Sequence, residues 1–179
     1  MANSTFNLSA LNGSNGFSIN SINAGDYLVV SNALDINGDG IDDLILGASR
    51  AGLNGDRSGQ SYVVFGNKSG FSSSLNLSSL NGSNGFIING ITTGDESGYS
   101  VSNAGDINGD GIDDLIIGAP DANPNGDYSG QSYVVFGNKS GFSSSLNLSS
   151  LNGSNGFIIN GITIGDFSGN SVRGAMRFC

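Results

Sequence analysis

The sequence predicts an all-β protein built from the four-stranded antiparallel blades of a β-propeller. Three observations lead to this fold class. A long segment of the chain repeats itself. Short apolar runs alternate with clusters of Gly, Asn, Asp and Ser, which is the pattern of strands and turns. No stretch keeps a 3.6-residue apolar period over three turns, so helices should be nearly absent.

The repeat defines the organisation of the chain. Residues 58–92 recur without a change at 129–163, at an offset of 71 residues. The 179 residues therefore hold an incomplete propeller of about two to two and a half blades. We predict four parts: residues 1–24 as the end of a preceding blade, 25–92 as a first repeat, 93–163 as a second repeat, and 164–179 as the start of a third repeat with a divergent tail.

Each unit contains four short apolar runs. In the second unit these runs are Tyr99–Ala104, Leu115–Gly118, Ser132–Phe136 and Phe157–Ile162. Successive side chains of a strand point to opposite faces, so Tyr62 and Val64 face one way and Val63 and Phe65 the other. A strand that is apolar on both faces needs a layer on each side, as a blade between two other blades has. A β-sandwich is the alternative, but its strands would show alternation of apolar and polar residues.

The charge and composition exclude several classes of function. The chain has 15 acidic and 6 basic residues and a net charge of −9, which argues against nucleic acid or an anionic membrane as partner. It has no His, so imidazole-dependent triads and His-ligated zinc are excluded. Its single Cys cannot form an intrachain disulfide. No apolar run is long enough for membrane insertion.

Eight of the 15 acidic residues lie in two nonapeptides, residues 35–43 and 106–114, both with the sequence DINGDGIDD. Oxygen-bearing side chains stand at positions 1, 3, 5 and 9, Gly stands at position 6, and position 7 can offer its carbonyl. This is the front part of a calcium loop, in which oxygen ligands converge on a hard cation. Position 12 is Leu46 or Ile117, so the loop is not an EF-hand. A solvated Asn/Asp/Gly turn is the simpler alternative.

The segment DINGDGIDDLIIGAP (106–120), preceded by SGYSVSNAG and followed by SGQSYVVFG, resembles the FG-GAP repeat of integrin α-subunit propellers, especially of bacterial integrin-α-like repeat proteins. The resemblance implies a seven-bladed propeller with about one blade per repeat and a calcium loop between the inner two strands of a blade. It differs at Gly47-Ala48-Ser49, where the family has Gly-Ala-Pro. The calcium ligands that it implies are Asp35, Asn37, Asp39, Ile41 (carbonyl) and Asp43 in the first loop, and Asp106, Asn108, Asp110, Ile112 (carbonyl) and Asp114 in the second.

These observations predict a non-catalytic segment that binds two Ca²⁺ ions and serves in adhesion or recognition. The resemblance implies an extracellular or cell-surface location, although no signal peptide is visible in the first residues. Expected partners are further blades of the same propeller or a second copy, with a protein or glycan as the ligand. Two alternatives stay open: a structural spacer in a larger secreted protein, and a glycosidase fragment that uses two carboxylates.

The tail carries one more expectation. A third calcium loop would begin at residue 177, at the same offset of 71 residues, but Arg177 stands there in place of Asp. We therefore expect no third metal site and a disordered, truncated end.

Overall fold

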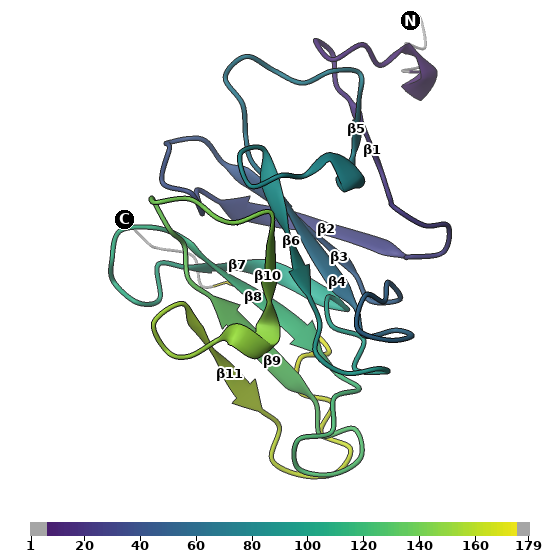
Figure 1. The fold of residues 1–179 in the computed structure, drawn as a ribbon, viewed down its shortest axis with the longest axis vertical. Helices are drawn as coiled ribbons and strands as arrows, with labels where there is room; N and C mark the ends of the chain where they lie inside the picture. The colour runs from purple at the N-terminus through teal and green to yellow at the C-terminus, as the bar shows by residue number, and fades with distance from the viewer. Residues whose placement is uncertain (1–6, 175–179) are drawn as a thin grey trace, which may run out of the picture.

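A computed structural model describes residues 7–174 of the chain (Figure 1). The Arg177 position of the sequence analysis lies outside these residues. Two antiparallel four-stranded blades lie one after the other along the molecule. Blade 1 consists of β2 (Leu28–Leu34), β3 (Asp43–Ala48), β4 (Gln60–Val64) and β6 (Gly85–Asn89). Blade 2 consists of β7 (Ser100–Gly105), β8 (Asp114–Ala119), β9 (Gln131–Val135) and β11 (Gly156–Asn160).

The predicted all-β class and the four-stranded blades are confirmed. Each of the four apolar runs of the second unit forms one strand of blade 2, in chain order. The only helical segments in residues 7–174 are single 3-10 turns: η1 (Leu8–Ala10), η2 (Leu77–Ser79) and η3 (Leu148–Ser150). No helix in this range is long and apolar enough to cross a membrane.

Three short strands join neighbouring units in a way that the sequence analysis did not anticipate. We call β5 (Ser74–Asn76) and β10 (Ser145–Asn147) strap strands, because each pairs in parallel with the outer strand of the preceding unit. The strap strand β10 pairs with β6 and becomes a fifth strand of that sheet. The strap strand β5 pairs with β1 (Ser18–Asn20) in a separate two-stranded sheet at the N-terminal end of the molecule (Figure 1).

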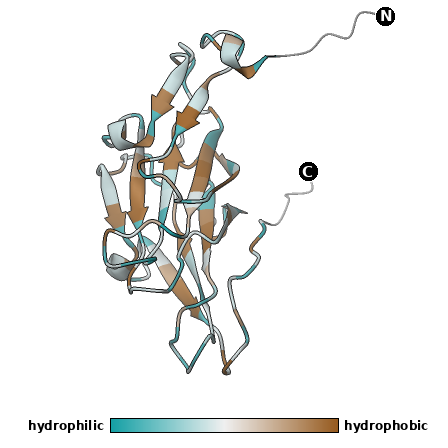
Figure 2. Cartoon of the chain, turned by 90° about the vertical axis from the view of Figure 1, so that its right-hand side faces the viewer, coloured by the Kyte–Doolittle hydropathy of each residue, from teal (hydrophilic) through white to brown (hydrophobic). Residues whose placement is uncertain are grey.

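A continuous apolar core lies between the two blades. Blade 1 contributes Ile45, Val63 and Phe86 to it, and blade 2 contributes Leu115 and Tyr133, all fully buried. A second apolar cluster on the far face of blade 1 contains Tyr62 and Val64. The predicted division of residues 62–65 between two faces is therefore confirmed, and Figure 2 shows the apolar residues concentrated in the strands.

The far face of blade 2 has no such cover within residues 7–174. The pentapeptide GFIIN forms both β6 and β11, so the local sequence is the same. Phe86 and Ile88 of β6 are 0% and 1% exposed, whereas Phe157 and Ile159 of β11 are 36% and 43% exposed. Packing of the next unit, and not the sequence of the strand itself, decides whether this strand is buried.

Two pairs of non-glycine residues with left-handed backbone mark the junctions between units. Arg57 and Glu96 have φ of 54° and 53°, the Glu96 N–H donates to the Arg57 carbonyl, and the side chains form an ion pair of 3.5 Å. At the next junction Tyr128 and Phe167 have φ of 57° and 49°, make the same backbone hydrogen bond, and stack their rings at 5.4 Å. Positive φ is uncommon for such residues. The two junctions therefore share an unusual backbone conformation, while their side chains differ.

Candidate metal centre

Each acidic nonapeptide lies at the same place in its blade. Residues 35–42 connect β2 to β3, and residues 106–113 connect β7 to β8. The glycines at position 6, Gly40 and Gly111, have φ of 85° and 87°, which supports the predicted backbone reversal there. Gly38 and Gly109 at position 4 also have positive φ, a second reversal that the sequence analysis did not single out. Two reversals within three residues curl the loop around its own side chains.

In the first loop, the side chains at positions 1, 3 and 5 all turn toward the loop backbone. Asp35 accepts hydrogen bonds from the N–H groups of Asp39 and Gly40, each at 2.9 Å. The Asn37 Oδ1 accepts from the Asp39 N–H at 2.9 Å, and its Nδ2 donates to an Asp39 carboxylate oxygen at 3.2 Å. The Asp39 Oδ1 accepts from the Ile41 N–H at 2.9 Å. The three side chains are therefore held within one turn of chain.

The second loop repeats this arrangement. Asp106 accepts from the N–H groups of Gly109, Asp110 and Gly111 at 2.8–3.0 Å. Asn108 accepts from the Asp110 N–H and donates to the Asp110 carboxylate, both at 2.9 Å. The Asp110 Oδ1 accepts from the Ile112 N–H at 2.9 Å. The two loops thus share the hydrogen bonds of the first loop, and the second loop adds one more, from the Gly109 N–H.

The aspartate at position 9 is buried at the start of the second strand of each blade. Asp43 accepts from the N–H groups of Ile36 and Gly66 at 3.2 and 2.8 Å, and it is 1% exposed. Burial is the main cause that raises its pKa to about 7; the two N–H donors lower the pKa, and the charges of Asp39 and Asp35 add to the rise. Burial likewise raises the pKa of Asp114, which accepts from the Ile107 and Gly137 N–H groups.

The donor set fits a hard divalent cation. Every side-chain donor proposed for the site is a carboxylate or an amide oxygen, and each of these oxygens has more than one lone pair, so it can accept an N–H bond and still bind a metal. Within residues 7–174, however, no three acidic or Cys side chains converge closely enough to enclose an ion. The ligand assignments, including the Ile41 and Ile112 carbonyls, therefore stay predictions.

The structure also shows contacts of the first loop with blade 2 that the sequence analysis missed. The Asp35 N–H donates to the Asp113 carboxylate at 3.4 Å, and the Asn138 N–H donates to the Ile36 carbonyl at 2.9 Å. The side chain of Lys139 lies against Gly38. Asp113 is one of the two clustered acids outside the predicted ligand set, and its sequence position beside Asp114 is the signal that could have drawn attention to it.

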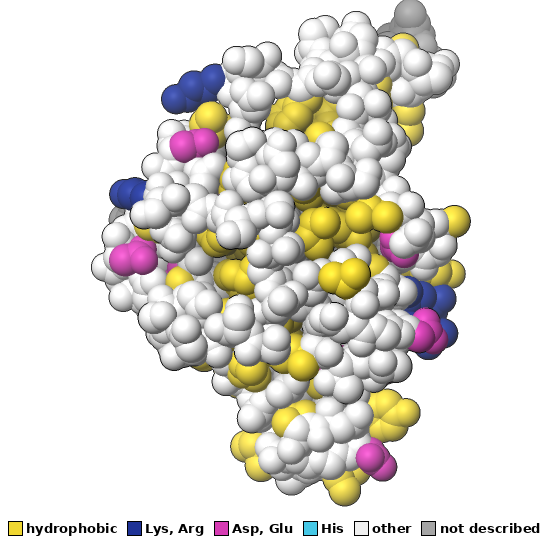
Figure 3. All heavy atoms as spheres, in the orientation of Figure 1, with side chains coloured by type: hydrophobic (Ala, Val, Ile, Leu, Met, Phe, Trp, Pro, Cys, Tyr) yellow, Lys and Arg dark blue, Asp and Glu magenta, His cyan; other side chains and the backbone are white. Residues whose placement is uncertain are grey.

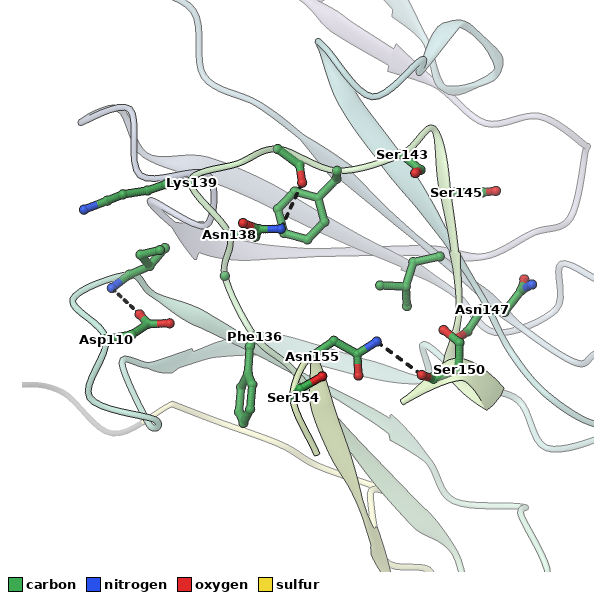
Figure 4. A pocket seen from close by; sticks show the side chains of 15 residues that line it. Asp110, Phe136, Asn138, Lys139, Ser143, Ser145, Asn147, Ser150, Ser154 and Asn155 are labelled. Carbon is green, nitrogen blue, oxygen red and sulfur yellow. Dashed lines mark hydrogen bonds between the residues drawn. The ribbon is translucent and has the colours of Figure 1, made fainter. Parts of the chain in front are cut away.

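A groove of about 720 Å³ adjoins the second loop (Figure 4). Its lining combines Asp110 and Lys139 with Phe136 and the amides of Asn138 and Asn155. A groove of about 590 Å³ with the equivalent lining, including Asp39, Phe65 and Lys68, adjoins the first loop. Each repeat therefore presents a polar groove with an aromatic wall next to its acidic loop.

Comparison with known proteins identifies the repeated unit. The FG-GAP repeat model matches residues 29–64 and 97–135, which include both acidic loops. Over 54 residues, 28% of its length, the chain is 48% identical to integrin alpha ina-1 of Caenorhabditis elegans. Over 119 residues, 59% of its length, it is 34% identical to a phosphatidylinositol-glycan-specific phospholipase D of Dictyostelium discoideum. The matches cover only 5% and 12% of these two relatives. They confirm the resemblance to integrin-α-like repeats.

Proposed function

We propose that this chain, which carries two FG-GAP repeats, is a calcium-stabilised β-propeller segment that serves in adhesion or recognition outside the cell and has no catalytic activity. One observation carries the calcium part of the proposal. The same nonapeptide occupies the same connection in both blades, with a shared set of hydrogen bonds at positions 1, 3 and 5 and a buried carboxylate at position 9.

Electrostatics supports a cation in these loops. Burying an ionised carboxylate is unfavourable unless an opposite charge or several donors compensate for it. Asp43 lies close enough to Asp39 and Asp35 for their charges to raise its pKa, and no Lys or Arg is among the causes that shift it. A bound Ca²⁺ would supply the missing positive charge, and it suits the flexible oxygen coordination of such a loop. Each ion would also cancel two of the negative charges of an acidic chain.

The role in recognition rests on the relatives and on the grooves. An integrin α relative suggests an extracellular or cell-surface setting. Beside one Asp and one Lys of opposite charge, the grooves next to the loops offer amides, hydroxyls and phenylalanine rings, which suit a protein loop or a glycan better than a highly charged ligand. A structural spacer is the second proposal, in which the grooves have no ligand.

The non-catalytic role rests on the state of the clustered acids. In each loop the carboxylates at positions 1, 5 and 9 accept backbone N–H bonds, so they are poor candidates for the free general acid of a glycosidase. The phospholipase D match concerns a small part of that protein and names no acid of this chain as catalytic.

Titration calorimetry with Ca²⁺ tests the metal sites. We expect two ions per chain, with dissociation constants of about 10⁻⁴–10⁻³ M, the range of extracellular modules. Asp39→Ala and Asp110→Ala should each remove one ion, and the double variant should remove both. Asp42→Ala is the matched control, because Asp42 lies in the same loop but outside the predicted ligand set.

A stoichiometry below one, or an unchanged stoichiometry in both Asp39→Ala and Asp110→Ala, would overturn the calcium proposal. Turnover of a polysaccharide panel by the purified chain would overturn the non-catalytic proposal. Calcium-dependent retention on a glycan or matrix-protein array would support recognition over the spacer role.

A further inference from the structure

The three outer strands of the chain outnumber the strap strands by one. The sequence Gly-Phe-x-Ile-Asn occurs at residues 16–20, 85–89 and 156–160, which contain β1, β6 and β11. The strap strand β5 pairs with β1 and the strap strand β10 pairs with β6. Within residues 7–174 the outer edge of β11 pairs with no strand. An unpaired edge of this kind is a template for another chain.

The two strap pairings are built in the same way, so they define what β11 requires. Ile19 lies opposite Leu75, and Ile88 lies opposite Leu146, in the same parallel register. In each pair an Asn side chain of the outer strand donates to the Asn of the strap strand at 2.9 Å. In each pair a Phe in or directly before the outer strand stacks on a Phe that precedes the strap strand, with ring centroids 4.2 and 4.1 Å apart.

The strand β11 has the same side chains that make these contacts in β6. Phe157 is the equivalent of Phe86, and Asn160 is the equivalent of Asn89. The Asn160 Oδ1 already accepts from Gln131 at 2.8 Å, as the Asn89 Oδ1 accepts from Gln60 at 2.8 Å. The apolar side chains of β11 are exposed, and Figure 3 shows hydrophobic side chains reaching the surface in the middle and at the lower end of the molecule.

The present partner of the strap strand β5 is β1, which belongs to a less stable sheet than β11 does. Residues 11–20 and 151–160 have the same sequence except that Ser18 stands where Ile158 does. The outer strand β1 belongs to a two-stranded sheet, and both of its end residues are exposed. Two-stranded sheets are marginally stable. The outer strand β11, by contrast, has three strands of blade 2 behind it and offers Ile in place of Ser.

We propose that two copies of this chain join head to tail, with β11 of one copy displacing β1 of the other from its strap strand β5. The blade 2 face that covers β6 has Ile117, Tyr133 and Leu148. The blade 1 face that would cover β11 has Leu46, Tyr62 and Leu77 at the same positions of the repeat. Because the two contacting surfaces differ, the contact can propagate from copy to copy or close into a ring.

Cysteine trapping tests the register. The β1–β5 register places position 158 of one copy opposite Ser74 of the other. In a Cys179→Ser background, protein with Ile158→Cys is mixed with protein with Ser74→Cys under mild oxidation. We expect a disulfide-linked pair of unlike chains. Ile162→Cys mixed with Ser74→Cys is the matched control and should give no such pair, because Ile162 lies beyond the end of β11.

Sedimentation of the unmodified full chain provides the second readout. We expect species larger than the monomer that increase with concentration, and fewer of them in Ile159→Asp, whose altered side chain is already exposed in the monomer. A monomer at all concentrations together with no trapped pair would overturn the proposal. Trapping of two Ile158→Cys chains with each other, and not with Ser74→Cys, would also overturn it, because that product requires edge-to-edge pairing of two β11 strands.

Discussion

The identical pentapeptides of β6 and β11 allow one substitution to be compared in two environments. Ile88→Ala removes three carbons from a side chain that is 1% exposed, and Ile159→Ala removes the same carbons from one that is 43% exposed. The loss of strand propensity is the same in both, because the neighbouring residues are the same. The difference in stability between the two variants therefore measures the packing of blade 2 against β6.

The expected magnitudes follow from burial. A fully buried Ile→Ala change costs about 2–5 kcal/mol, because lost transfer energy and a cavity add together. Each buried CH₂ contributes about 0.8 kcal/mol. Because Ile159 is roughly half exposed, its change to Ala should cost about 1 kcal/mol and leave no enclosed cavity. Ile88→Ala should therefore lower the free energy of unfolding by about 2 kcal/mol more than Ile159→Ala does.

Urea unfolding with saturating Ca²⁺ is the assay. Tyrosine fluorescence can follow it, because the chain has no Trp and both Tyr62 and Tyr133 are fully buried. The protein concentration should be one at which sedimentation shows a monomer. Equal losses in the two variants under that condition would refute the reasoning, because they would mean that blade 2 does not cover β6 in solution.

Two further outcomes are expected. With calcium chelated, the free energy of unfolding should fall as the pH rises from about 4 toward 7. Because the pKa of Asp43 is raised on folding, the folded state holds this proton more tightly than the unfolded state does. The resulting stabilisation is fully present below pH 3.8, the ordinary pKa of the group, and is lost by about pH 7. Urea unfolding across this range measures it, and Asp43→Asn should flatten the slope. Phe142→Ala should destabilise the chain by about 3 kcal/mol, since its ring lies 4.1 Å from that of Phe86 in the interblade core, whereas Phe71→Ala should cost less because Phe71 stacks on Phe17, beside the marginal β1. Similar losses in the two Phe variants would contradict this ranking.

The strands of the blades could be predicted from the sequence because their signal is local. In residues 62–65 four apolar residues follow one another, and their alternation fixes which side chains face each layer. The glycine at position 6 of each loop likewise carries its own conformational signal, which the positive φ of Gly40 bears out. The repeat then extended these local assignments from one blade to the next.

The strap strands could not be predicted, because their pairing depends on distant residues. Ser74–Asn76 has little strand propensity of its own and becomes a strand only by pairing with β1, more than fifty residues away. The contact of Asp113 with the Asp35 N–H is also invisible in the sequence, since it joins two loops through the stacking of the blades. The surroundings of Asp43 are a third such feature, because its carboxylate accepts from the N–H of Gly66, which follows β4 and is distant in the sequence.

The repeated sequence gives the folding chain a problem of register. Because residues 58–92 and 129–163 are identical, β6 can pair with β9 as well as with β4, and β11 can pair with β4, at nearly equal local energy. Misassembly of this kind is characteristic of repeat proteins. The side chains at the two junctions are not interchangeable: a native order brings Arg57 to Glu96 and Tyr128 to Phe167, whereas an exchanged order would place a charge against an aromatic ring. The two junction pairs therefore provide an energetic difference between the correct order and its permutation, where the strands themselves provide none.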